Sequence, residues 1–270
     1  MPRRRSKSRS FAGGSDLFGG PFLRSVILAR DVVPSFDRYP FSIPAIRDFH
    51  QLDLHPRVTF LVGENGVGKS TLIEGIAVAA GFNAEGGSKN FTFSTNDTVS
   101  ELHDALRLIR GMPREKDGYF LRAESLYNVA SEIDRLGEGL VDSYGGRSLH
   151  AQSHGESFMA LALNRFRGQG LYILDEPEAA LAPSRQLAML VVIHRLVNEG
   201  GSQFLIATHS PILMAYPDAT IYQLAAEGGI RQIAYEETEH FRVTRDFLND
   251  RDAYLAALLS DDEYEPPRSR

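Results

Sequence analysis

The 270-residue sequence contains no cysteine. This absence excludes a disulfide-stabilised scaffold, a zinc–thiolate site, an iron–sulfur cluster and a catalytic cysteine. The sequence also lacks an apolar run of the roughly 18 residues that a membrane-spanning helix requires, so no membrane span is predicted. The N-terminal arginines are followed by a polar, Gly-rich stretch at residues 11–16, where an export signal would need an apolar segment. We therefore expect a cytoplasmic protein.

Acidic residues outnumber basic ones outside the N-terminal end. Five of the 29 Lys and Arg residues lie within residues 1–10, which contain no acid. The formal net charge of the whole chain is −6, so the remaining residues carry −11. An acidic body does not favour a broad nucleic-acid groove, which needs clustered cations. We predict a disordered basic arm at residues 1–20, a globular domain at 21–260 and an acidic, Pro-containing tail at 261–270. The arm is the one segment expected to reach a nucleic acid or an acidic partner, and a solvated tail is its simpler interpretation.

Short apolar strands alternate with helical segments along the predicted domain. Strands are predicted at residues 22–30, 44–50, 57–62, 118–123, 171–174, 203–207, 219–224 and 230–234. Helices are predicted at residues 69–80, 99–110, 124–136, 156–167, 183–198 and 240–259. This alternation predicts an α/β fold, with a mainly parallel sheet flanked by helices. The last two strands predict a short antiparallel addition to that sheet.

A glycine-rich segment between a predicted strand and a predicted helix fits the phosphate-binding pattern G-x-x-x-x-G-K followed by Ser or Thr. The matching residues are Gly63, Glu64, Asn65, Gly66, Val67, Gly68, Lys69 and Ser70. Glycines let backbone N–H groups converge on phosphate oxygens, and the helix N-terminus adds partial positive charge. Lys69 is then placed to reach the β- and γ-phosphates, and the Ser70 hydroxyl to bind Mg²⁺. We predict an ATP–Mg²⁺ site at this loop and include the next residue, Thr71.

Two further apolar strands end in residues suited to phosphate chemistry. Asp175 and Glu176 follow residues 171–174, and His209 follows residues 203–207. Because the carboxyl ends of parallel strands lie beside a phosphate loop, Asp175 is placed to hold Mg²⁺ through water. Glu176 is placed to polarise the attacking water, and His209 to contact that water or the γ-phosphate. In isolation, acids that follow a strand are often merely exposed and a single histidine is usually structural; the upstream loop favours the catalytic interpretation.

The order of these motifs resembles the ABC-type ATPase superfamily, which includes transporter ATPases and the Rad50, SMC and RecF proteins. The resemblance covers roughly residues 22–260 and is strongest to short stand-alone bacterial proteins called AAA family ATPases. Ser153-His154-Gly155-Glu156-Ser157 occupies the place of the family's signature, Leu-Ser-Gly-Gly-Gln. The resemblance implies ATP hydrolysis by a head-to-tail homodimer around two ATP–Mg²⁺. In such a dimer Ser153, Gly155 and Glu156 would contact the ATP held by the partner's phosphate loop.

Several positions depart from the family pattern. His154 replaces the first signature glycine, and Ala182 stands where the family commonly has the aspartate of its D-loop. No glutamine stands at a convincing Q-loop position, and the nearest substitutes are Arg122 and Glu124. Of these, Glu124 is the weaker candidate for a contact with the metal ion. Three aromatic residues are near enough in sequence to stack on adenine, although packing in the core explains each of them more simply: Phe36, Tyr39 and Phe41.

The leading functional hypothesis is an ATP-hydrolysing switch that acts on an unknown protein partner. The alternatives are the nucleotide-binding subunit of a membrane transporter, an ATP-dependent DNA-repair or defence ATPase, and an ATP-binding module without useful turnover. Only 83 residues separate Ser70 from Ser153, which leaves no room for the long coiled-coil arm of a Rad50-like protein.

Overall fold

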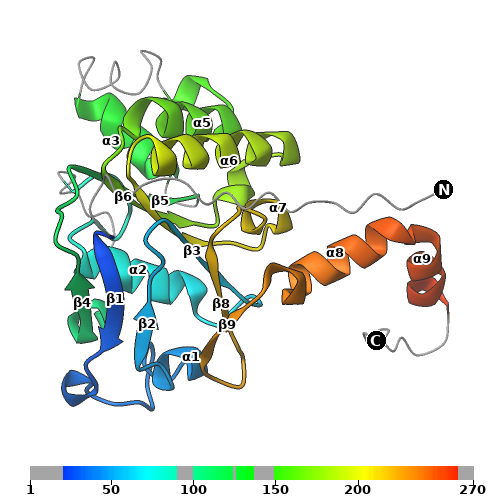
Figure 1. Cartoon of the computed structure of the whole chain (residues 1–270), viewed down its shortest axis with the longest axis horizontal. Coiled ribbons are helices and arrows are strands. Elements are labelled where there is room, and N and C mark those ends of the chain that lie inside the picture. Colours follow the sequence, from blue (N-terminus) through cyan, green and yellow to red (C-terminus); the bar gives the residue numbers. More distant parts are fainter. Residues whose placement is uncertain (1–20, 90–99, 124–125, 137–148, 261–270) are drawn as a thin grey trace, which may run out of the picture.

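The computed structural model describes residues 21–89, 100–123, 126–136 and 149–260. The predicted arm, the predicted tail and Glu124 lie outside these ranges. A six-stranded sheet forms the centre of the described chain, in the order β5-β6-β7-β3-β8-β9 (Figure 1). Its strands are β3 (Val58–Val62), β5 (Asp117–Arg122), β6 (Gly170–Asp175), β7 (Gln203–Ala207), β8 (Thr220–Leu224) and β9 (Ile230–Ile233).

The register of this sheet brings three strand ends to one edge. The first five strands in the spatial order are parallel, and β9 runs antiparallel to β8. Leu61 of β3 and Asp175 of β6 both pair with Ala207, the last residue of β7. Every residue of β3, β6 and β7 is buried, as expected for parallel strands covered on both faces. The mainly parallel α/β sheet with a terminal antiparallel hairpin is therefore confirmed.

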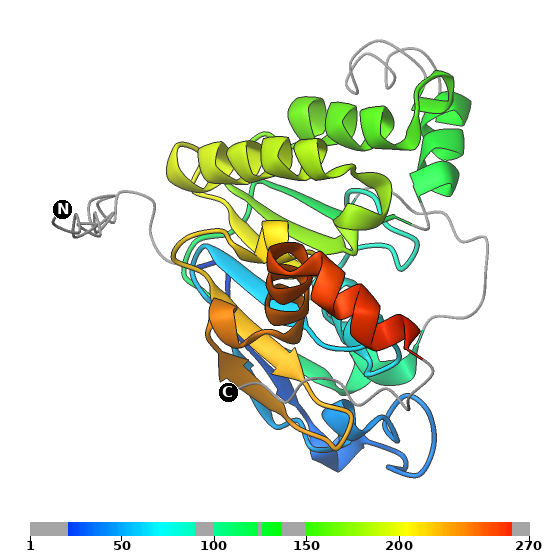
Figure 2. The same cartoon turned by 90° about the vertical axis from the view of Figure 1, so that its right-hand side faces the viewer.

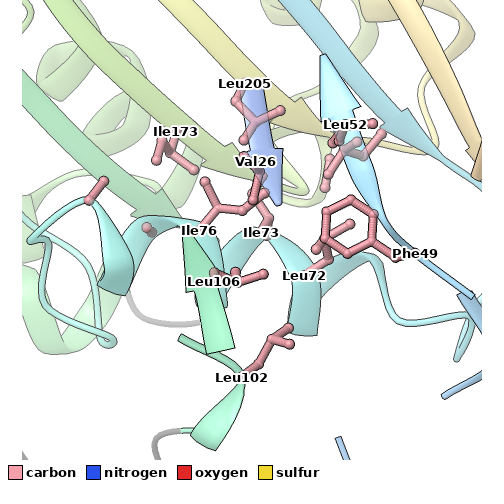
Figure 3. Packing of buried hydrophobic residues seen from close by; sticks show 14 of the residues in the cluster. Val26, Phe49, Leu52, Leu72, Ile73, Ile76, Leu102, Leu106, Ile173 and Leu205 are labelled. Carbon is pink, nitrogen blue, oxygen red and sulfur yellow. The ribbon is translucent and has the colours of Figure 1, made fainter. Parts of the chain in front are cut away.

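One face of the large sheet is covered by α2 (Lys69–Ala79) and, beyond it, by a second sheet. This second sheet is antiparallel, in the order β2-β1-β4. Its strands are β1 (Leu23–Leu28), β2 (Gln51–Asp53) and β4 (Leu106–Arg110). Ile73 and Ile76 of α2 are fully buried in the cluster that also holds Val26 of β1 and Ile173 of β6 (Figure 3). This apolar packing holds α2, and so the end of the phosphate loop, against the sheet.

The opposite face of the large sheet carries three other helices. These are α3 (Leu126–Leu136), α5 (His154–Arg165) and α6 (Pro183–Asn198), which lie together on one side of the sheet while α2 lies on the other (Figures 1 and 2). Phe158 of α5 and Ile193 of α6 are fully buried in a cluster with Tyr172 and Phe204 of the sheet. The segment that resembles the family signature, at the start of α5, is thus built onto the face away from α2.

Four further α-helices lie within the described ranges. They are α1 (Pro44–Arg47), α7 (Pro211–Met214), α8 (Glu239–Asn249) and α9 (Arg251–Leu259). The last two form an arm that extends from the body of the molecule (Figure 1). Asp250 separates them, and its side chain accepts a hydrogen bond from the N–H of Ala253, so the single helix predicted for residues 240–259 is two. Within the ranges that the structure describes, no helix combines the length and apolarity that crossing a membrane requires.

The helix predicted at residues 99–110 is wrong over its described part. Ser100 caps a short 3₁₀ turn at Glu101–Ala105, and the following residues form β4, which pairs antiparallel with β1. Leu106 and Leu108 alternate with more exposed neighbours, whereas Leu102 and Leu106 also fit the period of a helix. Short apolar patterns of this kind fit the periodicity of a helix as well as that of a strand. Pairing with β1 makes this segment a strand.

The strand predicted at residues 44–50 is also wrong. Pro44 begins the short helix α1, where its fixed φ and missing N–H suit the first turn. Ala45 and Ile46 bury their side chains from this helix. The extended segment starts only at Gln51, as β2.

Candidate nucleotide-binding site

The phosphate loop, residues 63–68, connects β3 to α2. Gly68 precedes the first turn of α2 with a φ of 101°, and Gly66 has a φ of 82°, angles that residues with side chains rarely adopt. A Cβ at Gly66 would meet no atom within 4 Å, so this part of the loop borders open space. The first N–H groups of α2 receive no side-chain cap from Gly68, and uncapped N–H groups at a helix start are suited to binding phosphate.

The side chain of Lys69 folds back across this loop. Its Nζ donates hydrogen bonds to the carbonyl oxygens of Gly63, at 3.0 Å, and Glu64, at 2.8 Å. Lys69 is buried, and burial lowers the pKa of its ammonium group, while the nearby carboxylates of Glu176 and Asp175 act in the opposite direction. A cation is thus held inside the loop, as the motif predicts.

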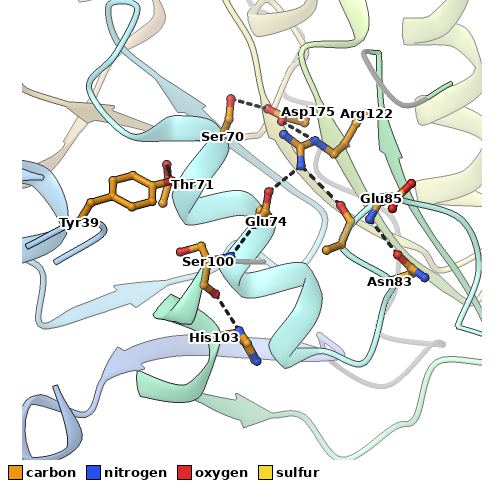
Figure 4. Close-up of polar contacts among 11 residues, drawn as sticks. Tyr39, Ser70, Thr71, Glu74, Asn83, Glu85, Ser100, His103, Arg122 and Asp175 are labelled. Carbon is orange, nitrogen blue, oxygen red and sulfur yellow. Dashed lines mark hydrogen bonds and ion pairs between the residues drawn. The ribbon is translucent and has the colours of Figure 1, made fainter. Parts of the chain in front are cut away.

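Ser70 and Asp175 meet at the end of β6 (Figure 4). The Ser70 hydroxyl donates to Asp175 Oδ1 at 3.1 Å. Arg122, at the end of β5, lies beside them, with its Nε 3.5 Å from Asp175 Oδ2 and its Nη1 2.6 Å from Glu74 Oε2. Of the two residues proposed in place of a Q-loop glutamine, Arg122 therefore lies at this site.

The Ser70–Asp175 pair offers the ligand chemistry that Mg²⁺ prefers. Mg²⁺ is usually bound by one or two protein oxygens together with waters and substrate phosphates, rather than by an all-protein cage. A hydroxyl and a carboxylate oxygen stand 3.1 Å apart here, next to the phosphate loop. No group of three or more His, Asp or Glu side chains that could hold a metal ion occurs within the described ranges; the Ser70–Asp175 pair could hold Mg²⁺ together with a nucleotide.

Glu176 and His209 come together where β6 and β7 end. His209 Nε2 lies 3.4 Å from Glu176 Oε1. Glu176 has a φ of 48°, a left-handed conformation that is rare outside glycine, and its N–H donates to the carbonyl oxygen of Ala207. Such strained backbone is concentrated at functional sites. Burial lowers the pKa of His209, as do the charges of Lys69 and His240, while Glu176 raises it.

Glu178 is a site residue that sequence reasoning missed. Its carboxylate accepts hydrogen bonds from the Thr208 hydroxyl, at 2.7 Å, and from the backbone N–H of His209. Burial raises the pKa of Glu178, and these two hydrogen bonds oppose that rise. Glu178 therefore joins the chain after β6 to the chain after β7 and fixes the backbone of His209. Its position two residues after Glu176 was the only signal in the sequence.

His240 of α8 is a second residue that was missed. Its Nε2 lies 2.8 Å from His209 Nδ1. With Glu64 and Asn65 of the phosphate loop, both histidines line a pocket of about 400 Å³, whose other residues come from α8. No sequence motif marks His240, because the contact joins residues 31 positions apart in the chain.

Ser153 and Glu156 of the predicted signature form hydrogen bonds with each other at the start of α5. Ser153 caps α5, and its hydroxyl and backbone N–H both donate to the Glu156 carboxylate, while the Ser153 hydroxyl accepts from the N–H of Glu156. Glu156 Oε1 also lies 3.5 Å from Arg185 Nη2 of α6. These contacts stay within α5 and its neighbour α6, on the face of the sheet away from α2.

Gly155→Ala tests the close packing at the start of α5. A Cβ at Gly155 would lie 2.8 Å from the Ala180 carbonyl oxygen and 2.8 Å from Arg185 Nη1. Helix propensity alone would favour alanine by up to about 1 kcal/mol, but overpacking costs about 1–3 kcal/mol. We expect a lower melting temperature by calorimetry. The exposed neighbour provides the control, since His154→Ala should change stability by less than about 0.5 kcal/mol. A gain in stability for Gly155→Ala would contradict the close approach.

The three aromatic residues considered for stacking on adenine differ in their solvent exposure. Phe41 is 1% exposed and is a core residue, and Phe36 packs edge-on against it with ring centroids 6.4 Å apart. Tyr39 is 64% exposed, and its hydroxyl lies 3.4 Å from the Thr71 hydroxyl at the start of α2 (Figure 4). The expectation that Tyr39 belongs to the core is wrong, because its ring stays in solvent while its hydroxyl reaches α2.

Comparison with known proteins gives matches to nucleotide-binding proteins. A family described as AAA domain matches residues 41–125. The thiamine import ATP-binding protein ThiQ of Cereibacter sphaeroides is 30% identical over 168 residues, which cover 56% of this chain and 70% of that protein. ThiQ of Haemophilus influenzae is also 30% identical over 168 residues, covering 56% of this chain and 75% of that protein.

A solved structure was also matched. It is cbiO1 from Clostridium perfringens, described as part of the ABC transporter complex cbiONQ. It is 18% identical, with 78% of this chain and 90% of that chain covered and a TM-score of 0.43.

Proposed function

Because the chain belongs to the ABC-type P-loop ATPase superfamily, we propose that it binds ATP with Mg²⁺ and hydrolyses it. The observation that carries this proposal is the convergence of Lys69, the Ser70–Asp175 pair and the Glu176–His209 pair at one edge of the sheet. Phosphoryl transfer requires a cation that binds the phosphates, oxygen ligands for Mg²⁺ and a carboxylate that acts on the attacking water.

Binding of the phosphates rests on the loop and on Lys69. The Lys69 ammonium now bonds to two loop carbonyl oxygens, and phosphate oxygens would replace them as stronger, charged acceptors. The N–H groups at the start of α2 would bind the same phosphates. Mg²⁺, held by Ser70 and Asp175, would neutralise charge on the β- and γ-phosphates. Tyr39, exposed beside Thr71, is the aromatic ring that we assign to adenine.

Hydrolysis is assigned to the residues at the ends of β6 and β7. Glu176 is the carboxylate that accepts a proton from the attacking water, and its side chain is 38% exposed. His209 directs its Nε2 toward Glu176 and donates a hydrogen bond to the γ-phosphate or to that water. Glu178 keeps His209 in place through the backbone N–H of that residue.

We further propose that two copies of the domain, residues 21–260, close head-to-tail around two ATP molecules and act as a switch on a protein partner. The position of α5 supports this arrangement, because Ser153, Gly155 and Glu156 lie on the face of the sheet away from α2. A second chain would then bring its own signature segment to the phosphates.

A transporter subunit is the second candidate, favoured by the sequence similarity to thiamine import ATP-binding proteins. The substitutions His154 and Ala182 disfavour it, since they alter segments through which the family couples its two sites. Purification of the tagged chain from detergent-treated membranes distinguishes the two functions. A stoichiometric membrane-embedded partner would establish the transporter subunit, and recovery without one would support the switch.

Lys69→Ala is expected to weaken ATP binding tenfold or more, or by about 1.4 kcal/mol. The variant removes the ammonium group from the loop but leaves the backbone N–H groups in place. Isothermal titration calorimetry with ATP and Mg²⁺ measures the change. Lys116→Ala removes the same charge from an exposed position and should bind like the wild type. Equal affinity of the Lys69→Ala protein and the wild type would show that this loop is not the nucleotide site.

A further inference from the structure

His209 makes different contacts through its two ring nitrogens. Nδ1 lies 2.8 Å from His240 Nε2, with the two ring centroids 4.9 Å apart and the rings inclined by 62°. Nε2 is buried and lies 3.4 Å from Glu176 Oε1, without a hydrogen bond. The ring therefore bridges α8 and the carboxylate assigned to the attacking water.

The short N···N contact has a consequence for the proton of His209. A hydrogen bond between two ring nitrogens needs one proton between them, and a neutral imidazole carries a single proton. Burial lowers the pKa of both histidines, which favours the neutral form of each. Either His240 donates from Nε2 and the proton of His209 is on its own Nε2, or His209 donates from Nδ1 and its Nε2 is unprotonated.

Glu176 distinguishes the two arrangements. With an unprotonated Nε2, the electron-rich nitrogen of His209 would lie 3.4 Å from a carboxylate oxygen, which is repulsive. With a protonated Nε2, the positive end of the N–H dipole lies near the same oxygen and is attracted to it, although no hydrogen bond forms. The geometry thus favours His240 as the donor, in agreement with the rule that the partner of one ring nitrogen sets the protonation of the other.

The start of α8 is anchored so that His240 keeps this position. Thr238 caps the helix, accepts from the N–H of Phe241 and donates to the carbonyl oxygen of Tyr235 at 2.7 Å. The Tyr235 hydroxyl in turn donates to the carbonyl oxygen of Pro211 at 2.9 Å. Because Pro211 comes two residues after His209, the two histidines are held by a short, hydrogen-bonded connection.

We propose that His240 is a positioning residue for ATP hydrolysis: it donates a hydrogen bond to His209 Nδ1 and so keeps the proton of His209 on Nε2, directed at the γ-phosphate site. The proposal rests on the proposed ATPase function. It makes the C-terminal arm part of the hydrolysis machinery, since α8 carries the residue that prepares His209.

The kinetic test compares two substitutions of His240. His240→Leu removes the donor, and we expect kcat to fall about tenfold or more with KM for ATP nearly unchanged. His240→Gln restores an N–H donor at similar reach and should recover most of the lost rate. His50→Leu removes an exposed histidine that directly precedes β2 and should match the wild type. A wild-type kcat in His240→Leu would overturn the proposal, and so would an equal loss of rate in the folded Leu and Gln variants.

The direct test locates the proton of His209. Long-range ¹H–¹⁵N NMR of the full chain labelled on histidine, without nucleotide, should show the His209 proton on Nε2; His209→Gln identifies the signal. In His240→Leu the same ring should become a mixture of both forms. A proton on Nδ1 in the wild-type protein would overturn the proposal, even if the Leu variant did not fold. Because this measurement needs no ATP, its result stands apart from whether the protein hydrolyses ATP.

Discussion

Glu176→Gln is expected to lower the rate of ATP hydrolysis by about 100-fold or more, while ATP still binds. The amide keeps the size of the side chain and its contact with His209 but cannot accept a proton from water. The left-handed backbone of Glu176, fixed by its N–H bond to Ala207, holds either side chain in the same place. Phosphate release measures turnover, and calorimetry measures ATP affinity.

The same variant reports on dimerisation. If ATP closes the dimer and hydrolysis opens it, slow hydrolysis should let the dimer accumulate with ATP and Mg²⁺, and light scattering should give twice the mass of one chain. Glu199→Gln, an equal change at an exposed position, serves as the control and should hydrolyse ATP normally. A wild-type rate in Glu176→Gln would show that another group activates the water.

The centre of the fold was predictable because β6 and β7 are almost entirely apolar. Residues 171–174 and 203–207 are buried on both faces in β6 and β7, and no polar residue interrupts either run except Gln203 at its start. Since parallel strands end at the same edge, the residues that follow them had to lie near one another. The meeting of Ser70 with Asp175 follows from this geometry.

The outer parts of the fold were not predictable in the same way. Residues 106–110 became β4 because β1 offers a free edge, a property of the tertiary structure and not of the local pattern. The apolar residues that follow Pro44 suited a strand as well as the short helix that they form. Local periodicity does not contain the information that selects between such states.

In the candidate site, too, the local sequence predicts some residues, whereas others depend on tertiary packing. Lys69 and Ser70 were found because one loop needs them at fixed spacing. Glu178 and His240 were missed because their role depends on which elements pack beside His209, through contacts spanning about 30 residues of sequence. Tyr39 was misjudged as a core residue because an aromatic side chain alone does not reveal its exposure.

Mixing Ser153→Arg with Lys69→Ala is expected to restore part of the ATPase activity that each variant lacks alone. Arginine at position 153 would leave ATP binding to one chain nearly intact but block closure of the dimer by its bulk. Lys69→Ala would fail because it holds ATP poorly. A heterodimer of the two has one site built from two undamaged halves and one site with both lesions, so the mixture recovers activity if a single intact site can turn over. Phosphate release from the mixture, over a range of ratios, measures the recovery.

The capping role of Ser153 requires its own control. Ser153→Ala removes the hydroxyl that caps α5 and should cost about 1 kcal/mol of stability without adding bulk. If capping were the whole function of Ser153, the Arg and Ala variants would melt at similarly lowered temperatures, and both would keep appreciable turnover. Under the proposed arrangement, only Ser153→Arg loses hydrolysis while its affinity for ATP persists. Near-normal activity of Ser153→Arg by itself would end the assignment of this segment to the partner's nucleotide, because an arginine could not be accommodated against a bound γ-phosphate in a closed dimer.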